Sequence, residues 1–178
     1  MKLKRILLDM DGVLVNFVDA ALTVHNIKPI ENWTPGVEDV CDLVPMSKND
    51  FWGKIDKTSH EFWANIPKYP WTDDLIKIVK KSNIPFTIAT KPSRNMFSAS
   101  GKIECLRRLF GKKFNDFMIG GQKYLMANPE TLLVDDWTPN MKPFIDAGGQ
   151  FYLFPQPWNK GNIDDRLTGL ERILKNES

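Results

Sequence analysis

The amino-acid sequence predicts an α/β protein with a Rossmann-like parallel sheet, helices on both faces of that sheet, and a small helical cap inserted after the first strand. Short apolar runs of strand length alternate with longer segments whose apolar residues recur at helical spacing. Three of these runs end in a polar residue, namely Asp9, Thr90 and Asp135. Parallel strands bring their carboxyl ends to one edge, where such sheets bind ligands, so we expect these three side chains to lie together.

Five strands are expected, each a short and mostly apolar run. The proline at position 85 is tolerated because it falls near the start of its strand. Helical segments separate the runs, which favours parallel pairing. In chain order the strands are expected at residues 6–9, 84–90, 117–119, 131–135 and 151–154.

The helices of the sheet domain are marked by their ends as well as by their apolar faces. Thr72 is expected to cap a helix at 73–81, whose first turn is acidic and whose last turn is basic, as the helix dipole favours. A second helix is expected at 103–110, where apolar residues recur every three or four positions. Two more are expected after Pro139 and over 164–174.

The stretch between the first strand and Thr72 contains no convincing strand and is too long for a loop. A helix is expected at 16–26, Ser47 with Asp50 forms a capping-box pattern, and Ser59 is expected to cap a third helix. We interpret this stretch as the cap. The expected division is a core and a cap, at residues 1–15 with 73–178 and at residues 16–72 respectively.

Composition limits the classes of function. The 178 residues carry 24 Lys and Arg against 22 Asp and Glu, and this near balance argues against a nucleic-acid partner bound through bulk charge. The two cysteines lie far apart and there are only two histidines, so a zinc site is not expected. No apolar run approaches the length of a membrane span. We expect a soluble cytoplasmic protein without a membrane partner, and a homodimer is one assembly that the sequence leaves open.

The string Asp9-Met10-Asp11-Gly12 follows an apolar run directly. In an extended backbone Asp9 and Asp11 point to the same side, and two carboxylates that close repel unless a cation lies between them or one holds a proton. Gly12 permits a sharp turn. The string therefore indicates a metal site, a nucleophile with an acid/base partner, or both. The alternative is an ordinary turn, because Asp and Gly are turn residues.

Two further strand ends carry matching chemistry. Thr90 and Lys91 offer a hydroxyl and a cation at a strand-to-helix turn, which suits a phosphate. Asp135 and Asp136 form a second acidic pair, and Mg²⁺ prefers a few carboxylates together with waters and substrate oxygens. The candidate magnesium ligands are Asp9, Asp11, Asp135 and Asp136. The alternatives are a plain turn at Thr90 and a helix-capping role for Asp136.

Two lysines and a group of aromatic residues complete the pattern. Lys102 and Lys123 lie beside the acidic strand ends in the expected fold and are candidates for binding phosphate, although a single loop lysine is more often only solvated. Aromatic residues crowd the cap, and flat rings over a phosphate site could stack a nucleobase. The alternative is that they form the core of the cap. The candidate base-binding rings are Phe17, Phe51, Trp52 and Trp63.

At these residues the sequence resembles the haloacid dehalogenase-like superfamily of phosphohydrolases. The likeness covers four motifs in order, at residues 9–13, Thr90, Lys123 and 135–136. Within that superfamily it is most similar to the 5′(3′)-deoxyribonucleotidases, through residues 9–17, the cap aromatics and a tail at 154–159. Lys91 and Trp137 depart from that family, which usually has a small residue after the threonine and often has arginine after the paired aspartates.

The resemblance implies a magnesium-dependent phosphatase of nucleoside monophosphates. In that scheme Asp9 is the nucleophile, Asp11 is the general acid and base, and Mg²⁺ is held by Asp9, Asp135 and the backbone carbonyl of Asp11. Thr90, with Lys102 and Lys123, would hold the phosphate. The alternatives are a phosphatase of another small phosphate ester or of nucleic-acid ends, and a nucleotide-binding protein without catalysis.

Overall fold

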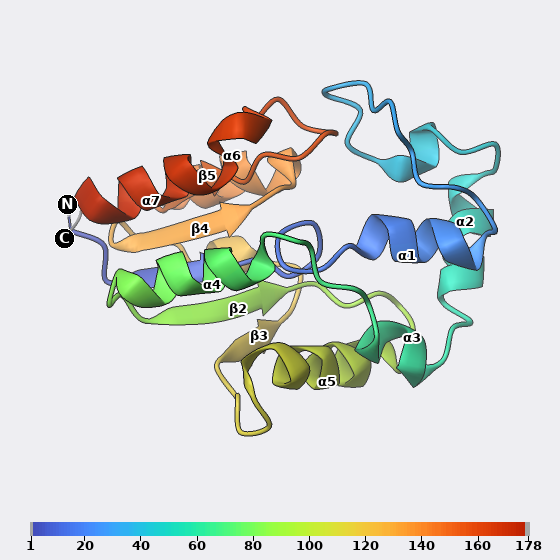
Figure 1. Cartoon of the computed structure of the whole chain (residues 1–178), viewed down its shortest axis with the longest axis horizontal. Coiled ribbons are helices and arrows are strands. Elements are labelled where there is room, and N and C mark those ends of the chain that lie inside the picture. Colours follow the sequence, from blue (N-terminus) through green and yellow to red (C-terminus); the bar gives the residue numbers. More distant parts are fainter. Residues whose placement is uncertain (1, 177–178) are drawn as a thin grey trace.

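The computed structural model describes residues 2–176, and its five strands form one parallel sheet (Figure 1). The order across the sheet is β3-β2-β1-β4-β5. This confirms the predicted fold class, with boundaries that move by one or two residues. The strands are β1 (Arg5–Leu8), β2 (Phe86–Thr90), β3 (Phe117–Ile119), β4 (Thr131–Asp135) and β5 (Gln150–Leu153).

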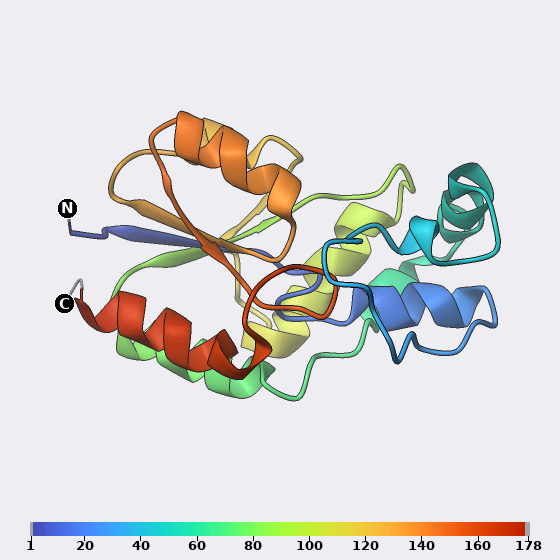
Figure 2. The same cartoon turned by 90° about the horizontal axis from the view of Figure 1, so that it is seen from above.

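Helices cover both faces of the sheet, as predicted. Figure 2 shows α6 (Thr138–Asp146) on one side and α4 (Thr72–Lys81) with α7 (Arg166–Asn176) on the other. Residues of β1 alternate between the two sides. Ile6 and Leu8 belong to the larger hydrophobic cluster, whereas Leu7 packs in a smaller cluster with Phe144 of α6. The remaining elements of this part are α5 (Ser98–Phe110) and the short 3-10 helices η2 (Lys123–Met126) and η3 (Ile163–Asp165).

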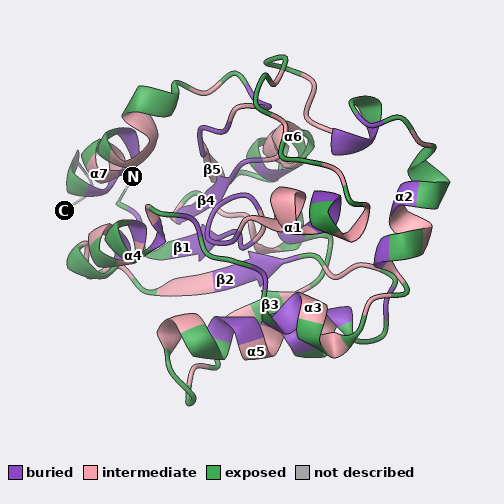
Figure 3. Cartoon of the chain, turned by 45° about the vertical axis from the view of Figure 1, so that its right-hand side comes forward, coloured by how far each residue is buried: buried purple, intermediate pink, exposed green. Residues whose placement is uncertain are grey.

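The sheet is built outward in opposite directions from β1 and β4: β2 and β3 follow on one side of β1, and β5 follows on the other side of β4. The chain passes from β1 to β2 on one side of the sheet and from β4 to β5 on the other. Such a switch point opens a crevice at the carboxyl ends of the two strands, because their following loops turn apart. Asp9 follows β1 directly and Asp135 ends β4, so both lie at this point. Figure 3 shows that β4 is buried along its length.

Residues 16–71 contribute helices beyond the carboxyl ends of the strands (Figure 1). No strand of the sheet comes from this segment within residues 2–176. Its division from the core at residue 72 stays a prediction. The elements are α1 (Phe17–Val24), the 3-10 helix η1 (Val40–Asp42), α2 (Lys48–Ile55) and α3 (His60–Ala64).

The helix ends confirm one predicted cap and correct another. The Ser47 hydroxyl accepts a hydrogen bond from the backbone N–H of Asp50 at 3.1 Å, so Ser47 caps α2, and its hydroxyl also donates to the Asp50 carboxylate at 2.6 Å. Thr72 is not the cap of α4, because it is the first helical residue and Trp71 precedes it. Its hydroxyl donates instead to the carbonyl of Leu14 at 2.6 Å, which ties the start of α4 to the loop after β1. Ser59 precedes α3 but makes no side-chain capping bond.

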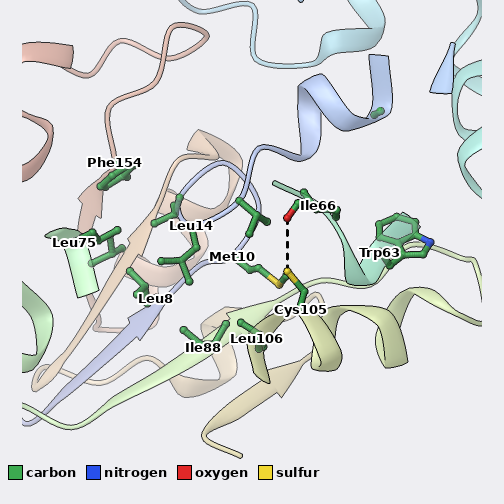
Figure 4. Close-up of a cluster of buried hydrophobic side chains, with 14 of the residues drawn as sticks. Leu8, Met10, Leu14, Trp63, Ile66, Leu75, Ile88, Cys105, Leu106 and Phe154 are labelled. Carbon is green, nitrogen blue, oxygen red and sulfur yellow. Dashed lines mark hydrogen bonds between the residues drawn. The ribbon is translucent and has the colours of Figure 1, made fainter. Parts of the chain in front are cut away.

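The hydrophobic core runs without a break from the sheet into the helical segment. Figure 4 shows Leu8 and Met10 of the first strand and its loop near Cys105 and Leu106 of α5. Phe51, Ile55 and Trp63, from α2 and α3, belong to the same buried cluster. Both cysteines are free and buried. No helix within residues 2–176 is long and apolar enough to span a membrane.

Helices α3 and α5 meet closely at Gly101. A Cβ atom at this position would overlap the Cβ of Trp63, and it would lie 2.9 Å from the carbonyl oxygen of His60 and 3.1 Å from the backbone nitrogen of Ala64. Two of these neighbours are backbone atoms, which cannot move aside cheaply. The glycine therefore sets the distance between the helical segment and the core.

Replacing Gly101 by alanine tests this contact. Alanine normally favours a helix over glycine by about 1 kcal/mol, but here overpacking should outweigh that gain and lower the free energy of unfolding by about 1–3 kcal/mol. Gly53 of α2 is the matched control, because a Cβ atom there meets nothing within 4 Å. Denaturant unfolding should show Gly53→Ala unchanged or stabilised. Equal stabilisation by both substitutions would contradict the close packing of α3 on α5.

Candidate active site

Two carboxylates from neighbouring strands share one lysine at the switch point. The Nζ atom of Lys123, at the start of η2, lies 2.7 Å from Oδ1 of Asp9 and 2.6 Å from Oδ2 of Asp135. All three side chains are buried. Asn140 of α6 also donates to Asp135 at 2.9 Å. The predicted meeting of Asp9, Asp135 and Lys123 is therefore found, and the lysine neutralises part of the acidic charge.

Asp136 adds a third buried carboxylate to this pair. One oxygen from each of Asp9, Asp135 and Asp136 lies within 4.8 Å of the others. Lys123 is the lysine that bonds to this group, and it contacts only two of the three carboxylates. Oxygen ligands in this number, with an excess of negative charge, suit a hard divalent cation such as Mg²⁺.

The third carboxylate is held in place by the chain after β5. The indole N–H of Trp158 donates to Asp136 at 2.8 Å, and the side-chain amide of Asn159 donates to its backbone carbonyl at 2.9 Å. Gly12 lies beneath the same carboxylate, with φ at +76°, and a Cβ atom there would overlap it. The side chain of Gln156 donates to the carbonyl of Gly12. The tail motif therefore fixes both the acidic group and the turn after β1.

Burial and mutual repulsion change the titration of these groups. Burial is the largest cause that raises the pKa of Asp9, to about 7, with Asp135 and Asp11 adding repulsion and Lys123 acting in the opposite direction. Burial and the charge of Asp135 also raise the pKa of Asp136 well above its ordinary value. Burial lowers the pKa of Lys123, but its two carboxylate partners outweigh burial and raise it overall. Among the described residues, the three carboxylates therefore have only one lysine to balance their negative charge.

Asp11 lies outside this cluster and pairs with the second lysine. The Nζ atom of Lys102, on α5, bonds to Oδ2 of Asp11, to the hydroxyl of Thr90 at 2.9 Å and to the carbonyl of Lys91 at 3.0 Å. The side chain of Asp11 is therefore not one of the three clustered carboxylates, and its place among the candidate magnesium ligands stays a prediction. Its other oxygen, Oδ1, is buried without a hydrogen-bond partner.

Lys91 takes a different position from the two buried lysines. Its side chain is exposed on the wall of the cavity described below, and its stem lies beside Gly121. Only its backbone carbonyl takes part in the hydrogen bonds around Lys102. The predicted contact between the Lys91 amine and a phosphate stays a prediction.

A cavity of about 610 Å³ connects the acidic cluster with the helical segment, and its lining includes Asp9, Asp11, Lys102 and Lys123. This volume is within the range of small-molecule sites.

Three aromatic rings of the helical segment form part of the cavity wall, which also includes Trp137 and Trp158. Phe17, Trp52 and Trp63 line it, and the ring of Phe17 stacks on both tryptophans at centroid distances of 5.8 Å. Phe51 does not line it, because its ring is fully buried and stacks on His25 at 4.7 Å. Successive residues of a helix point in different directions, so Trp52 faces the cavity while Phe51 fills the interior of the segment.

One contact beside the cavity was not visible in the sequence. Glu38, from the loop before η1, accepts a hydrogen bond from the backbone N–H of Thr138 at 2.8 Å and so caps α6. The alternative that Asp136 caps this helix is therefore wrong, because the carboxylate of Asp136 is bonded to Trp158. No local pattern relates Glu38 to a helix start 100 positions further along the chain.

No protein-family model and no curated protein sequence matches the chain. Solved structures do match. A HAD-superfamily hydrolase from Ehrlichia chaffeensis is 11% identical with a TM-score of 0.58, over 99% of this chain and 98% of that one. YfnB from Bacillus subtilis, a HAD hydrolase bound to magnesium, is 14% identical with a TM-score of 0.59, over 98% and 99%. A HAD-family hydrolase from Deinococcus radiodurans, with bound phosphate and sodium, is 12% identical with a TM-score of 0.54, over 97% and 88%. The chain therefore has the fold of these hydrolases.

The raised pKa of Asp9 makes stability depend on pH in a defined direction. The folded protein keeps the proton of Asp9 up to about pH 7, whereas the unfolded chain loses it near the ordinary value of 3.8. Unfolding between these values releases a proton, so the free energy of unfolding of the metal-free protein should fall as the pH rises through this window. Thermal unfolding at a series of pH values should show the fall, and Asp9→Asn should reduce its slope.

Magnesium should oppose this loss of stability. The ion binds the ionised carboxylate and competes with the proton, so it should raise the unfolding temperature more at the upper end of the window than at the lower end. Calorimetry with saturating Mg²⁺ measures both increases. An equal increase at both ends, or none at either, would contradict the role of Asp9 as a metal ligand.

Proposed function

We propose that the protein is a magnesium-dependent phosphatase that hydrolyses nucleoside monophosphates through an aspartyl-phosphate on Asp9. One observation carries this proposal: two groups of side chains, each with a carboxylate bonded to a buried lysine, lie together at the carboxyl ends of the strands. One group is the buried cluster around Lys123, and the other is Asp11 with Lys102 and Thr90. The fold supports the proposal, since similar structures are hydrolases that hold phosphate or magnesium.

The residues present fit a magnesium ion. Asp9, Asp135 and Asp136 offer carboxylate oxygens close together, they are buried, and the one lysine beside them leaves negative charge unbalanced. When bound, the ion would offset the repulsion between the carboxylate of Asp9 and the phosphate dianion.

Asp9 and Asp11 carry out the two proposed steps. In the first, a carboxylate oxygen of Asp9 attacks phosphorus in line, the ester P–O bond breaks, and Asp11, which carries a proton at this step, donates it to the leaving alkoxide. In the second, Asp11 takes a proton from a water molecule whose oxygen attacks phosphorus. The P–O bond to Asp9 then breaks, and inorganic phosphate leaves.

The lysines and Thr90 position the phosphate for these steps. The Lys102 amine reaches both Asp11 and Thr90, so a phosphate oxygen placed against them would lie next to the group that supplies the proton. Lys123 keeps Asp9 and Asp135 oriented and balances charge during the attack.

The shape of the cavity supports a nucleotide as the substrate. Its 610 Å³ extends from the acidic cluster to three stacked aromatic rings, which offer flat faces to a base. A nucleobase would add a further flat ring to this stacked group, whereas a small sugar phosphate has no ring face of that kind. The preference for deoxyribonucleotides rests on the likeness of residues 9–17 and 154–159 to the 5′(3′)-deoxyribonucleotidases.

Asp9→Asn tests the covalent mechanism. Asparagine has the shape of aspartate but is a poor nucleophile, so kcat for dUMP should fall by about 10³-fold or more while the circular dichroism spectrum stays unchanged. Asp42→Asn, an exposed acidic residue away from the cavity, is the control and should keep full activity. Magnesium-dependent release of phosphate measures both. Substantial activity in Asp9→Asn would rule out Asp9 as the nucleophile.

Trp52→Ala tests the nucleotide assignment. Loss of a stacking surface should lower kcat/KM for dUMP by about tenfold or more, because base stacking on an aromatic ring contributes about 1–3 kcal/mol. The same variant should change kcat/KM for 2-deoxyribose 5-phosphate far less. Parallel losses with both substrates, or equal turnover of both by the unmodified enzyme, would remove the support for a nucleotide substrate.

A further inference from the structure

Three buried side-chain atoms have no hydrogen-bond partner in the part of the chain that the structure describes. They are Oδ1 of Asp11, Oδ1 of Asp56 and Nε1 of Trp63. Buried polar atoms are nearly always paired, and leaving one unpaired destabilises the protein. All three residues line the same cavity. An occupant of that cavity is therefore the common source from which all three could obtain partners.

Asp11 stands at the catalytic end of the cavity, and its unpaired oxygen belongs to the proposed proton donor. The other two atoms belong to the helical segment, with Asp56 at the end of α2 and Trp63 within α3. The Asp56 oxygen is a hydrogen-bond acceptor and the Trp63 N–H is a donor. The ring centre of Trp63 lies 5.9 Å from Nζ of Lys102, so a molecule whose phosphate contacts Lys102 also reaches Trp63.

The backbone around both residues is firmly held. Asn95 is buried, and its side-chain amide donates to the carbonyls of Asp56 at 2.9 Å and Thr58 at 2.7 Å. Trp63 is 1% exposed, and its Cβ lies against Gly101 of α5. The backbone of Asp56 and the Cβ of Trp63 are therefore held in place, which limits the positions that their polar atoms can take.

We propose that the Trp63 indole N–H and the Asp56 carboxylate form a donor–acceptor pair that binds the polar edge of the nucleobase. This rests on the proposed function and adds to it the residues that distinguish a nucleoside from other leaving alcohols. A base presents an N–H next to a carbonyl oxygen, or an amino group next to a ring nitrogen. Asp56 accepts from the N–H and Trp63 donates to the neighbouring acceptor. A sugar phosphate offers no such planar edge.

The rings and the pair have separate roles. Phe17 and Trp52 offer faces for stacking, which tolerates any flat ring, whereas hydrogen bonds reject a ring that lacks the matching groups. Both polar atoms are shielded from water, and Phe17 is stacked on Trp63.

The test compares three phosphate esters in each enzyme: dUMP, its N3-methyl derivative, which lacks the N–H, and 2-deoxyribose 5-phosphate. The unmodified enzyme should prefer dUMP to the methylated nucleotide by roughly tenfold or more in kcat/KM. Trp63→Phe and Asp56→Asn should each reduce this ratio to near one, with little change for 2-deoxyribose 5-phosphate. Asp42→Asn, an exposed carboxylate in the same segment, is the matched control and should keep the full ratio.

Two results would overturn the proposal. One is equal use of dUMP and its methylated derivative by the unmodified enzyme, and the other is an equal loss with all three esters in both variants, which would indicate a purely structural role. The ratio of kcat/KM values for two esters within one enzyme does not change when part of the protein is unfolded. If Trp63→Phe does not fold, Asp56→Asn still tests the proposal, because asparagine keeps the shape of aspartate.

Binding separates this proposal from the catalytic one. Calorimetric titration of Asp9→Asn with dUMP and its methylated derivative, in the presence of Mg²⁺, measures recognition without turnover. If the unmodified protein hydrolyses no ester but the titrations retain the tenfold preference, the catalytic proposal fails and the base site stands. If esters are hydrolysed but the titrations show no preference, the base site fails alone.

Discussion

The structure depends on the balance of charge at the carboxyl ends of β1 and β4. Three buried carboxylates meet there and one lysine bonds to two of them. Burial is the largest cause that raises the pKa of Asp9 and Asp136, and repulsion between the carboxylates adds to it. The strand order creates this arrangement, because β1 and β4 are neighbours whose following loops turn to opposite sides of the sheet. Lys123 offsets part of the charge. Under the proposed function, the remaining negative charge favours a divalent cation, which in turn would offset the charge of an anionic substrate.

The parts of the chain outside the sheet complete this site rather than simply covering it. Trp158 and Asn159 hold Asp136 from the tail, and Glu38 caps α6 from the loop before η1. Helix α3 packs on α5 at Gly101, and the hydrophobic core continues from one into the other. The segment that lines the far end of the cavity is therefore fixed to the same framework as the acidic cluster, so the separation of the two ends is defined.

The sequence predicted what depends on local chemistry. Apolar runs ending in Asp9, Thr90 and Asp135 located the strand ends, and the parallel sheet then brought them together with Lys102 and Lys123. Contacts between distant segments could not be predicted in this way. The capping of α6 by Glu38 and the bond from the Thr72 hydroxyl to Leu14 both depend on the folded arrangement. Phe51 and Trp52 are adjacent and chemically alike, and only the packing of α2 shows which one faces the cavity.

The central claim is that Asp9 forms a covalent bond to phosphorus, and capture of that species tests it most directly. In Asp11→Asn the first step with p-nitrophenyl phosphate needs no proton donor, since nitrophenolate leaves unaided, but hydrolysis of the intermediate lacks its base. Rapid quenching and peptide mass spectrometry should therefore find a phosphoryl group on the peptide containing Asp9, with a burst of nitrophenolate close to the enzyme concentration. Steady release of nitrophenolate without a burst, and with no phosphorylated peptide, would contradict the account.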